Sequence, residues 1–489
     1  MLVGPVPGMR ATDSLKELKT VLKVSRISGG LAVLAMVLAQ QGVAAPKPPV
    51  DLLPKPAATP APAPVAAASP APVAAPSPAV SPAAPAVEPA PVTVPPPIVE
   101  PVRPWTLADA QALLGVIEKI DSEGLIPADY RPEALRAAIG AGEGLALDEV
   151  ASKSFAWLAE DLRDGRTPMP ARVQWFAVDP DQDVMPTDRL MAQALETRDV
   201  AGVLASLAPT HPDYGALRTA LAVTPASDAR MRAKIRANMD RWRWLARELG
   251  TIYLITNVPE FQLRLTVNDK IIRTYRTIVG KPGRTATPQL AETVEAVVFN
   301  PTWTVPQSIV VGEGLGPRLL ANPASARAQG YRVSKAANGM ITVVQQPGDN
   351  NSLGRMKIDM PNEHAIYLHD TPAKALFNTT VRAYSHGCIR TERAVELGMT
   401  MAILGAGLSP EEAAQNHLSM VYTKVPMTRT FPVYITYFTM GKDINGRLST
   451  YGDIYERDAP VLASFQAPRQ LKTSQRKSTE AIIKLDNPL

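Results

Sequence analysis

The segment Ala383-Tyr384-Ser385-His386-Gly387-Cys388-Ile389-Arg390 contains the only cysteine of this 489-residue chain. A cysteine attacks as its thiolate, so a nucleophilic cysteine requires a nearby base or a positive field that lowers its pKa. Three of the five histidines, His364, His369 and His386, lie within 25 residues of Cys388. The glycine before Cys388 also allows the backbone to approach a ligand closely. This pattern favours a nucleophilic cysteine served by a histidine base.

Two other interpretations of Cys388 are open at this point. A single cysteine is often a small buried apolar side chain. His369, His386 and Cys388 could instead bind zinc, although structural zinc sites usually have four ligands at closer spacing. We expect no metal ion and no cofactor. His364 and His369 are an odd number of positions apart, which in a strand places them on opposite faces, so we do not expect His364 to be catalytic.

The residues around Cys388 resemble the signature of the L,D-transpeptidase (YkuD-type) family. That signature is a His, about fifteen residues, Ser/Thr-His-Gly-Cys, a hydrophobic residue, and Asn or Arg. Here His369 is followed after fifteen residues by Ser385-His386-Gly387-Cys388-Ile389-Arg390. The large Gram-negative branch of the family, which has a scaffold domain and a capping subdomain, is further resembled by residues 298–306, 351–355 and 367–372. The resemblance covers roughly residues 105–465.

The chemistry expected from these residues is acyl transfer. Cys388 would attack an amide carbonyl with His369 as the proton acceptor, and backbone N–H groups around Gly387 and Cys388 would stabilise the oxyanion. His386 would orient the loop or tune the thiolate, and Ser385 would support the loop. Arg390 could hold a substrate carboxylate through two hydrogen bonds. Tyr367 and Trp303 resemble positions that line the cleft in the family.

The resemblance also implies a substrate class. The donor would be a tetrapeptide stem of peptidoglycan, cleaved with loss of D-alanine, and the acceptor would be the side-chain amine of a diamino acid in another stem. Water as acceptor would make the protein an L,D-carboxypeptidase, and an amine of an outer-membrane protein would make it an enzyme that attaches such proteins to the wall. A non-enzymatic wall-binding protein is the remaining alternative. Carbapenems are the inhibitors that the resemblance implies.

The N-terminal 44 residues have the layout of a secretory signal. Basic residues at positions 16, 19, 23 and 26 precede an apolar run from Ile27 to Ala39, and small residues follow at positions 42–44. The run is shorter than the ~20 apolar residues that span a bilayer, so cleavage and a periplasmic location are expected, with an uncleaved inner-membrane anchor as the alternative. Residues 1–44 carry five basic and two acidic side chains, so their removal lowers the formal net charge from +5 to +2. This small charge gives no reason to expect a nucleic-acid partner.

Residues 45–104 are expected to form a disordered linker, because 21 of the 48 prolines lie between Pro46 and Pro104 and such a segment cannot bury enough apolar surface to fold. Residues 105–227 have helical periodicity and a capping pattern at Thr106 to Asp109, which predicts a helical scaffold domain. Its predicted helices include 132–139, 148–162 and a helical region over 191–221.

Residues 228–465 are expected to form the catalytic domain. After a predicted helix over 231–249 the apolar period changes to two, and the strands are expected at 253–258, 261–267, 271–279, 294–299, 341–344, 365–368 and 433–438. Residues 306–350 interrupt the strands with short helices and predict a capping insertion, or lid. Residues 466–489 are expected to be a disordered tail. The predicted fold class is therefore α+β with several domains: a helical scaffold and a mainly-β, sandwich- or barrel-like catalytic domain carrying an inserted helical lid.

Overall fold

The structure is a computed structural model that describes residues 101–469 with the exception of 178, 180 and 430. The predicted signal segment, nearly all of the predicted linker and most of the predicted tail lie outside the described residues. Within the described range, no helix has both the length and the apolar character needed to cross a membrane.

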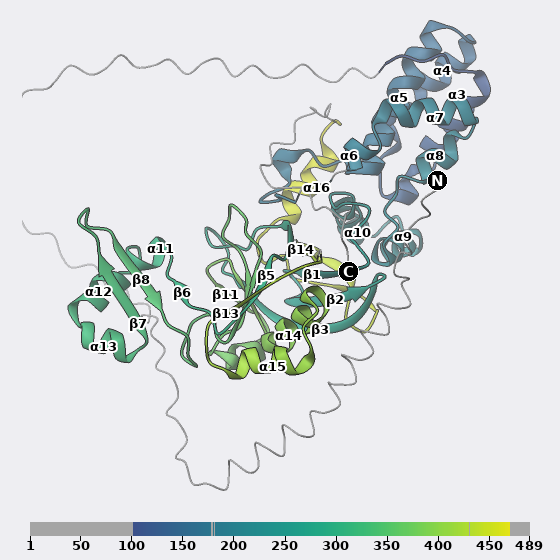
Figure 1. Ribbon diagram of the computed structural model, residues 1–489. Helices are drawn as coiled ribbons and strands as arrows, with labels where there is room; N and C mark the ends of the chain where they lie inside the picture. Colours follow the sequence, from purple (N-terminus) through teal and green to yellow (C-terminus); the bar gives the residue numbers. More distant parts are fainter. Residues whose placement is uncertain (1–100, 178, 180, 430, 470–489) are drawn as a thin grey trace, which may run out of the picture.

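The region predicted as a helical scaffold, residues 105–227, is helical from Leu107 to Val223, and α10 follows it; together they lie at one end of the molecule (Figure 1). Thr106 caps the first helix by accepting a hydrogen bond from Asp109 N–H at 3.2 Å, as the capping pattern predicted. The α-helices are α3 (Leu107–Ile117), α4 (Pro132–Ala141), α5 (Leu145–Asp164), α6 (Asp181–Val184), α7 (Thr187–Thr197), α8 (Val200–Ala205), α9 (Pro212–Val223) and α10 (Ala229–Trp242). Short 3-10 helices are η2 (Ile120–Glu123), η3 (Pro127–Tyr130) and η4 (Met169–Ala171).

The helix predicted over 231–249 ends earlier, at Trp242. Arg243 is buried and donates hydrogen bonds to Glu123 O at 2.5 Å and to the Tyr214 hydroxyl at 2.6 Å. Trp244 packs edge-on against Trp175 with ring centroids 5.1 Å apart. These tertiary contacts override the local helix propensity, so the chain leaves the helix where the scaffold meets the β-domain.

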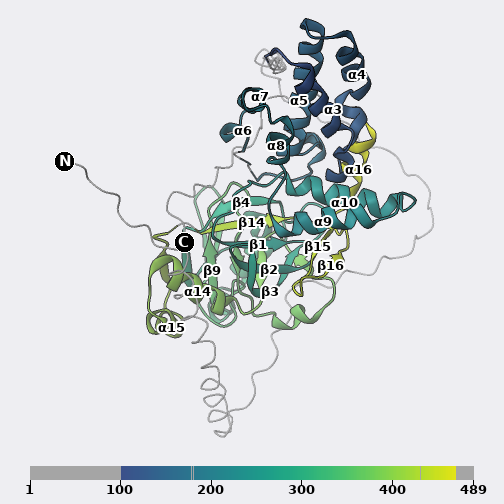
Figure 2. The same ribbon diagram turned by 90° about the vertical axis from the view of Figure 1, so that its right-hand side faces the viewer.

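The predicted mainly-β domain contains, in the described part of the chain, an 11-stranded curled sheet. Its order is β13-β5-β9-β10-β12-β3-β2-β1-β14-β4, with β11 paired to β3. The strands are β1 (Ile252–Asn257), β2 (Gln262–Val267), β3 (Lys270–Gly280), β4 (Leu290–Thr293), β5 (Ala296–Phe299), β9 (Met356–Asp359), β10 (Leu368–His369), β11 (Ala383–Ser385), β12 (Ile389–Thr391), β13 (Thr423–Pro426) and β14 (Pro432–Thr436). Figure 2 shows this sheet beneath the scaffold helices.

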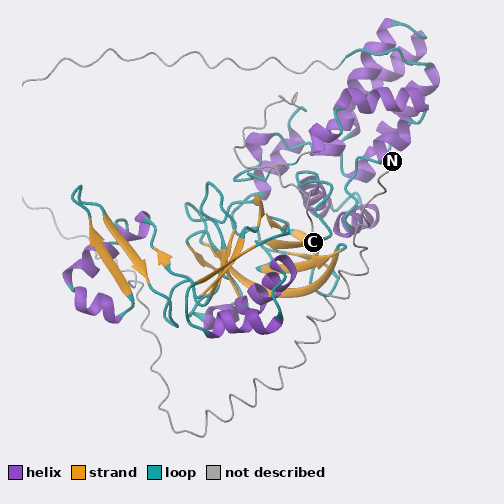
Figure 3. Cartoon of the chain, viewed as in Figure 1, coloured by secondary structure: helices purple, strands orange, loops and turns teal. Residues whose placement is uncertain are grey.

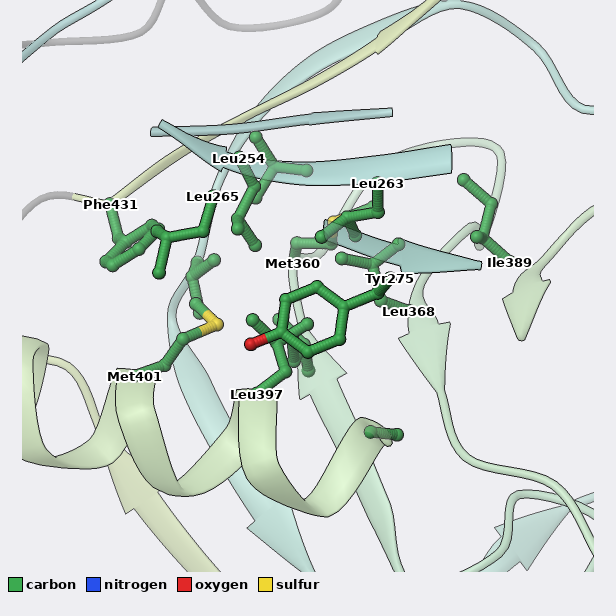
Figure 4. Packing of buried hydrophobic residues seen from close by; sticks show 14 of the residues in the cluster. Leu254, Leu263, Leu265, Tyr275, Met360, Leu368, Ile389, Leu397, Met401 and Phe431 are labelled. Carbon is green, nitrogen blue, oxygen red and sulfur yellow. The ribbon is translucent and has the colours of Figure 1, made fainter. Parts of the chain in front are cut away.

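The core of the β-domain lies between the sheet and α14 (Ala394–Ala406). Figure 4 shows Leu397 and Met401 of this helix facing side chains such as Leu368 and Tyr275 from the strands. Leu368 and Ile389 are fully buried in this core. The remaining elements of the domain are η5 (Lys374–Asn378), α15 (Pro410–Leu418), β15 (Met440–Lys442), β16 (Leu448–Thr450) and α16 (Asp458–Gln466).

The capping insertion is a separate α/β unit beside the main sheet, visible on the left of Figure 3. Besides the predicted helices it contains a three-stranded sheet, ordered β6-β8-β7, whose central strand corresponds to the strand predicted at 341–344. Its elements are β6 (Trp303–Thr304), α11 (Gln307–Val310), α12 (Leu315–Ala321), α13 (Pro323–Ala328), β7 (Tyr331–Lys335) and β8 (Ile341–Gln345). A small core of its own, including Val310, Leu319 and Val343, holds it together.

The predicted start of the disordered tail at Gln466 is wrong, because Gln466 is the last residue of α16. The chain also remains attached to the scaffold beyond that helix. Arg469 is buried and pairs with Glu160 at 2.7 Å and with Asp161 at 3.0 Å. These ion pairs join the C-terminal segment of the β-domain to α5.

Candidate active site

The pairing of two short strands sets the arrangement of the predicted catalytic residues. β10 and β12 run parallel, with Leu368 opposite Ile389 and His369 opposite Arg390. The pairing continues one residue earlier, because Ile389 N–H donates to Tyr367 O at 3.1 Å. Side chains alternate between the two faces of a strand, and Leu368 and Ile389 both enter the core (Figure 4). Tyr367, His369, Cys388 and Arg390 therefore share the opposite face.

His369 is almost entirely buried, with 5% of its surface exposed. Its Nδ1 lies 2.5 Å from Asp370 O, and because a carbonyl only accepts, Nδ1 carries the proton and Nε2 is left as the acceptor. Burial, and then the positive charge of Arg390, lower the pKa of His369 to about 3. At neutral pH the imidazole is therefore uncharged and can accept a proton.

Cys388 is partly exposed, and loss of hydration raises the pKa of its thiol. Hydrogen bonds with Tyr367 and the positive charges of Lys357 and Arg390 act in the opposite direction but do not compensate. The thiol donates to Ala365 O at 3.5 Å. No hydrogen bond to His369 is found among the residues described. A nucleophilic Cys388 would thus start as a neutral thiol that needs a proton acceptor before it can attack.

The loop before Cys388 is held by short hydrogen bonds. Ser385 Oγ donates to Cys388 O at 2.6 Å and accepts from Gly387 N–H at 3.2 Å. Gly387 has a φ of +120°, which side-chain-bearing residues rarely adopt. Its carbonyl accepts from Thr287 Oγ1 at 2.7 Å. Of the two predicted oxyanion donors, Gly387 N–H is therefore engaged by Ser385, whereas Cys388 N–H has no hydrogen-bond partner within the described residues.

His386 lies outside this face and contacts the capping insertion. Its Nε2 is 2.8 Å from Glu313 Oε1, in the turn between α11 and α12, and both side chains are partly exposed. His386 is thus in contact with the lid, and no hydrogen bond between it and Cys388 is found in the described chain.

Arg390 and Trp303 complete the predicted set. Burial lowers the pKa of Arg390, and within the described ranges its guanidinium has no ion-pair partner and its buried Nε has no hydrogen bond. A cation without a partner beside the thiol is suited to a carboxylate ligand. Trp303 lies in β6, at the start of the insertion. Burial raises the pKa of Tyr367, and the nearby Trp303 side chain acts in the opposite direction.

The strand predicted over 365–368 is not formed as expected. β10 begins only at Leu368, and Ala365 has a φ of +53° in a turn that starts at Asn362. The opposite-face argument for His364 therefore does not apply. His364 instead packs against Phe176 of the scaffold, with ring centroids 4.1 Å apart, and it stays outside our predicted catalytic set.

Several residues of the site were not predicted from sequence. Lys357 lies opposite His369 on β9 and places its Nζ 4.5 Å from the centre of the Tyr367 ring. Glu313 and Thr287 contact the loop of residues 385–388 from 73 and 100 residues away. No local pattern marks them, because their contacts arise only when distant segments pack. Across the described residues, no group of three or more His, Cys, Asp or Glu side chains could hold a metal ion.

Comparisons with known proteins identify two domain families in this chain. Residues 251–401 match the family model for the L,D-transpeptidase catalytic domain, and residues 104–221 match the model for the scaffold domain. A Haemophilus influenzae protein named "Putative L,D-transpeptidase" is 27% identical over 254 residues, which cover 49% of this chain and 51% of that protein. The chain therefore spans about half the length of the curated relative that it matches.

Solved structures are more distant. An L,D-transpeptidase from Mycobacterium smegmatis is 16% identical, with 38% of this chain and 59% of that chain covered and a TM-score of 0.19. L,D-transpeptidase 3 from Mycobacterium tuberculosis, in complex with a faropenem-derived adduct, is 12% identical, with 38% and 60% covered and a TM-score of 0.20.

Proposed function

This chain contains an L,D-transpeptidase catalytic domain at residues 251–401 and a scaffold domain at residues 104–221, and on that premise we propose that it cross-links peptidoglycan stem peptides. In this proposal Cys388 forms a thioester with a donor stem. The side-chain amine of a diamino acid in a second stem then accepts the acyl group. We expect the reaction in the periplasm, where this substrate is found.

The observation that carries the proposal is the common face of Cys388 and His369, which the pairing of β10 with β12 creates. A neutral thiol beside a neutral, buried imidazole suits a mechanism in which proton transfer accompanies attack. His369 Nε2 takes the thiol proton as sulfur bonds to the donor carbonyl carbon. The oxyanion is stabilised by the free N–H of Cys388.

Collapse of this intermediate breaks the amide bond, and the His369 proton goes to the departing D-alanine amine. The acceptor amine then loses a proton to His369 and attacks the thioester carbonyl, which releases the cross-linked product and restores the thiol. Arg390 is our proposed ligand for a substrate carboxylate, since it is a cation without an ion-pair partner in the described chain. Tyr367 and Trp303 are proposed to line the cleft.

The test is to incubate residues 45–489 with tetrapeptide muropeptides and to weigh the products. A dimer that has lost one D-alanine supports cross-linking. A tripeptide as the sole product would instead identify water as the acceptor and an L,D-carboxypeptidase. Transfer to an added lysine-containing peptide, in preference to a second stem, would indicate protein attachment. Unchanged muropeptides that bind without turnover would contradict an enzymatic role and favour a wall-binding protein.

A further inference from the structure

Thr287 makes a hydrogen bond to the catalytic loop that the mechanism above does not use. It lies between β3 and β4, with 0% of its surface exposed. Its Oγ1 accepts from Gly280 N–H at 2.9 Å and donates to Gly387 O at 2.7 Å. The hydroxyl therefore connects the end of β3 to the residue that precedes the nucleophile.

The bond acts on the peptide group that joins Gly387 to Cys388. This group is planar and trans, so its C=O and N–H point in opposite directions. By holding Gly387 O towards the buried interior, Thr287 turns Cys388 N–H the other way. Among the described residues that N–H has no hydrogen-bond partner, while the neighbouring Gly387 N–H is already bonded to Ser385 Oγ.

Hydrogen bonds to the backbone N–H and C=O of Thr287 hold the residue in place. Its N–H donates to the Tyr455 hydroxyl at 3.2 Å, and the same hydroxyl donates to Gly280 O at 2.6 Å. Gln289 Nε2 and Arg457 Nη2 donate to Thr287 O at 3.1 Å and 3.4 Å. The Arg457 guanidinium lies over the rings of Tyr437 and Tyr455, at 4.9 Å and 4.8 Å from their centres.

The same network reaches the scaffold. Arg457 donates to the side chain of Gln174, and the backbone of Gln174 accepts from Gln289 N–H at 2.9 Å. The next residue, Trp175, forms a parallel bridge with Gln289. A continuous set of hydrogen bonds thus runs from the scaffold segment through Thr287 to the loop of Cys388.

We infer that Thr287 is a positioning residue: its hydroxyl orients the peptide before Cys388 so that Cys388 N–H points at the oxyanion of the acylation step. This role rests on the proposed acyl transfer. It predicts a defect confined to steps in which a carbonyl oxygen gains negative charge. Alkylation of the thiol at a saturated carbon forms no oxyanion, so it should not need this orientation.

The test compares these two reactions in Thr287→Val, which removes the hydroxyl and keeps the branched shape. Acylation is measured as single-turnover release of D-alanine from tetrapeptide muropeptides, and alkylation as mass addition by iodoacetamide. We expect acylation to slow by about 10- to 100-fold and alkylation to be unchanged. Thr287→Ser retains a hydroxyl and should recover most of the acylation rate.

Thr391→Val is the matched control. Thr391 is also fully buried and lies on β12 beside the site, but its Oγ1 has no hydrogen-bond partner in the described residues. It should acylate like the wild type. If Thr287→Val does not fold, as judged by its melting curve, Thr287→Ala removes the same hydroxyl and is measured in the same way.

The remaining outcomes overturn the inference. Acylation at the wild-type rate without the hydroxyl would show that Cys388 N–H needs no such support. An equal loss of acylation and alkylation would show that Thr287 only maintains the loop. A wild type that is alkylated but never releases D-alanine would refute the proposed function itself, and this inference with it.

Discussion

The floor of the site and the capping insertion are held in different ways. The floor is formed by β10 and β12 in the interior of the main sheet, with Leu368 and Ile389 fully buried beneath it. The insertion has its own small core, and one of its contacts with the loop of residues 385–388 is the exposed pair Glu313–His386. Even a fully charged pair at such an exposed position typically contributes only about 0.2–1 kcal/mol.

This difference in burial separates the holding of the proposed chemical groups from the holding of the lid. The groups proposed to carry the chemistry lie on or beside buried strands, where loss of hydration sets their protonation. Breaking the exposed Glu313–His386 contact costs little free energy compared with disrupting the buried strands β10 and β12. The two histidines illustrate this contrast, because His369 is buried and neutral whereas His386 is exposed and pairs with the lid. The following experiments test the contrast, from the largest expected effect to the smallest.

Cys388→Ala should abolish turnover of tetrapeptide muropeptides and leave the fold intact, because the change is small and the thiol is the proposed nucleophile. Product mass measures the turnover, and the far-UV circular dichroism spectrum measures whether the fold is intact. Cross-linking retained by this variant would exclude a thiol mechanism. Loss of wild-type activity with a chelator and its recovery with zinc would instead revive a metal mechanism.

His369→Ala should slow acylation by at least the ~100-fold that a lost general base typically costs. His386→Gln should retain partial activity, because His386 contacts the lid and no hydrogen bond to Cys388 is found in the described structure. Rapid-quench measurement of D-alanine release compares the two variants. If His386→Gln were the slower one, the base would have been assigned to the wrong histidine.

The alkylation rate of Cys388 should rise about tenfold per pH unit through neutral and mildly alkaline pH, because burial raises the pKa of the thiol and its thiolate fraction is small. Mass addition by iodoacetamide across this pH range provides the profile, with the Cys388→Ala chain as the blank. A rate already at its plateau between pH 6 and 8 would reveal a resting thiolate–imidazolium pair and contradict the neutral site.

A carbapenem should add once to the wild type and not to Cys388→Ala, because the thiolate opens its strained amide to leave a thioester. We expect the lid to limit access of water to that thioester. Glu313→Gln weakens the lid contact and should shorten the adduct lifetime by a few-fold, as followed by intact-protein mass spectrometry. An unmodified but folded wild type under excess carbapenem would count against the transpeptidase assignment, and the muropeptide assay would then decide.

The last expected effect concerns stability rather than a reaction rate. His369 has a pKa of about 3 when folded and an ordinary value of 6.5, so below pH 6.5 the unfolded chain binds more protons than the folded one. The stability linked to its neutral form is present above pH 6.5 and is lost as the pH falls towards 3. Between pH 7 and 5 the urea midpoint of the wild type should therefore fall more than that of His369→Gln. Equal slopes would mean that His369 is not buried in its neutral form.

Much of the fold could be predicted because its signals are local. The period-two pattern located β1, β2 and β3, and the Asn268–Asp269 turn between the last two has both residues at positive φ. The Thr106 cap marked the start of α3. The end of α10 could not be predicted, because Arg243 and Trp244 leave the helix for contacts with Glu123, Tyr214 and Trp175.

The same distinction holds for the site. The sequence by itself determined the candidate nucleophile and base. Cys388 is the only cysteine, and His369 and the Ser-His-Gly-Cys run lie in one short segment with the spacing of the family signature. Only the tertiary structure decided the protonation of these groups, since desolvation depends on what packs around a side chain. It also decided which residues contact the loop: Thr287 reaches Gly387 and Glu313 reaches His386 across 100 and 73 positions of chain. Such contacts form when separate elements pack together, and no local periodicity records them.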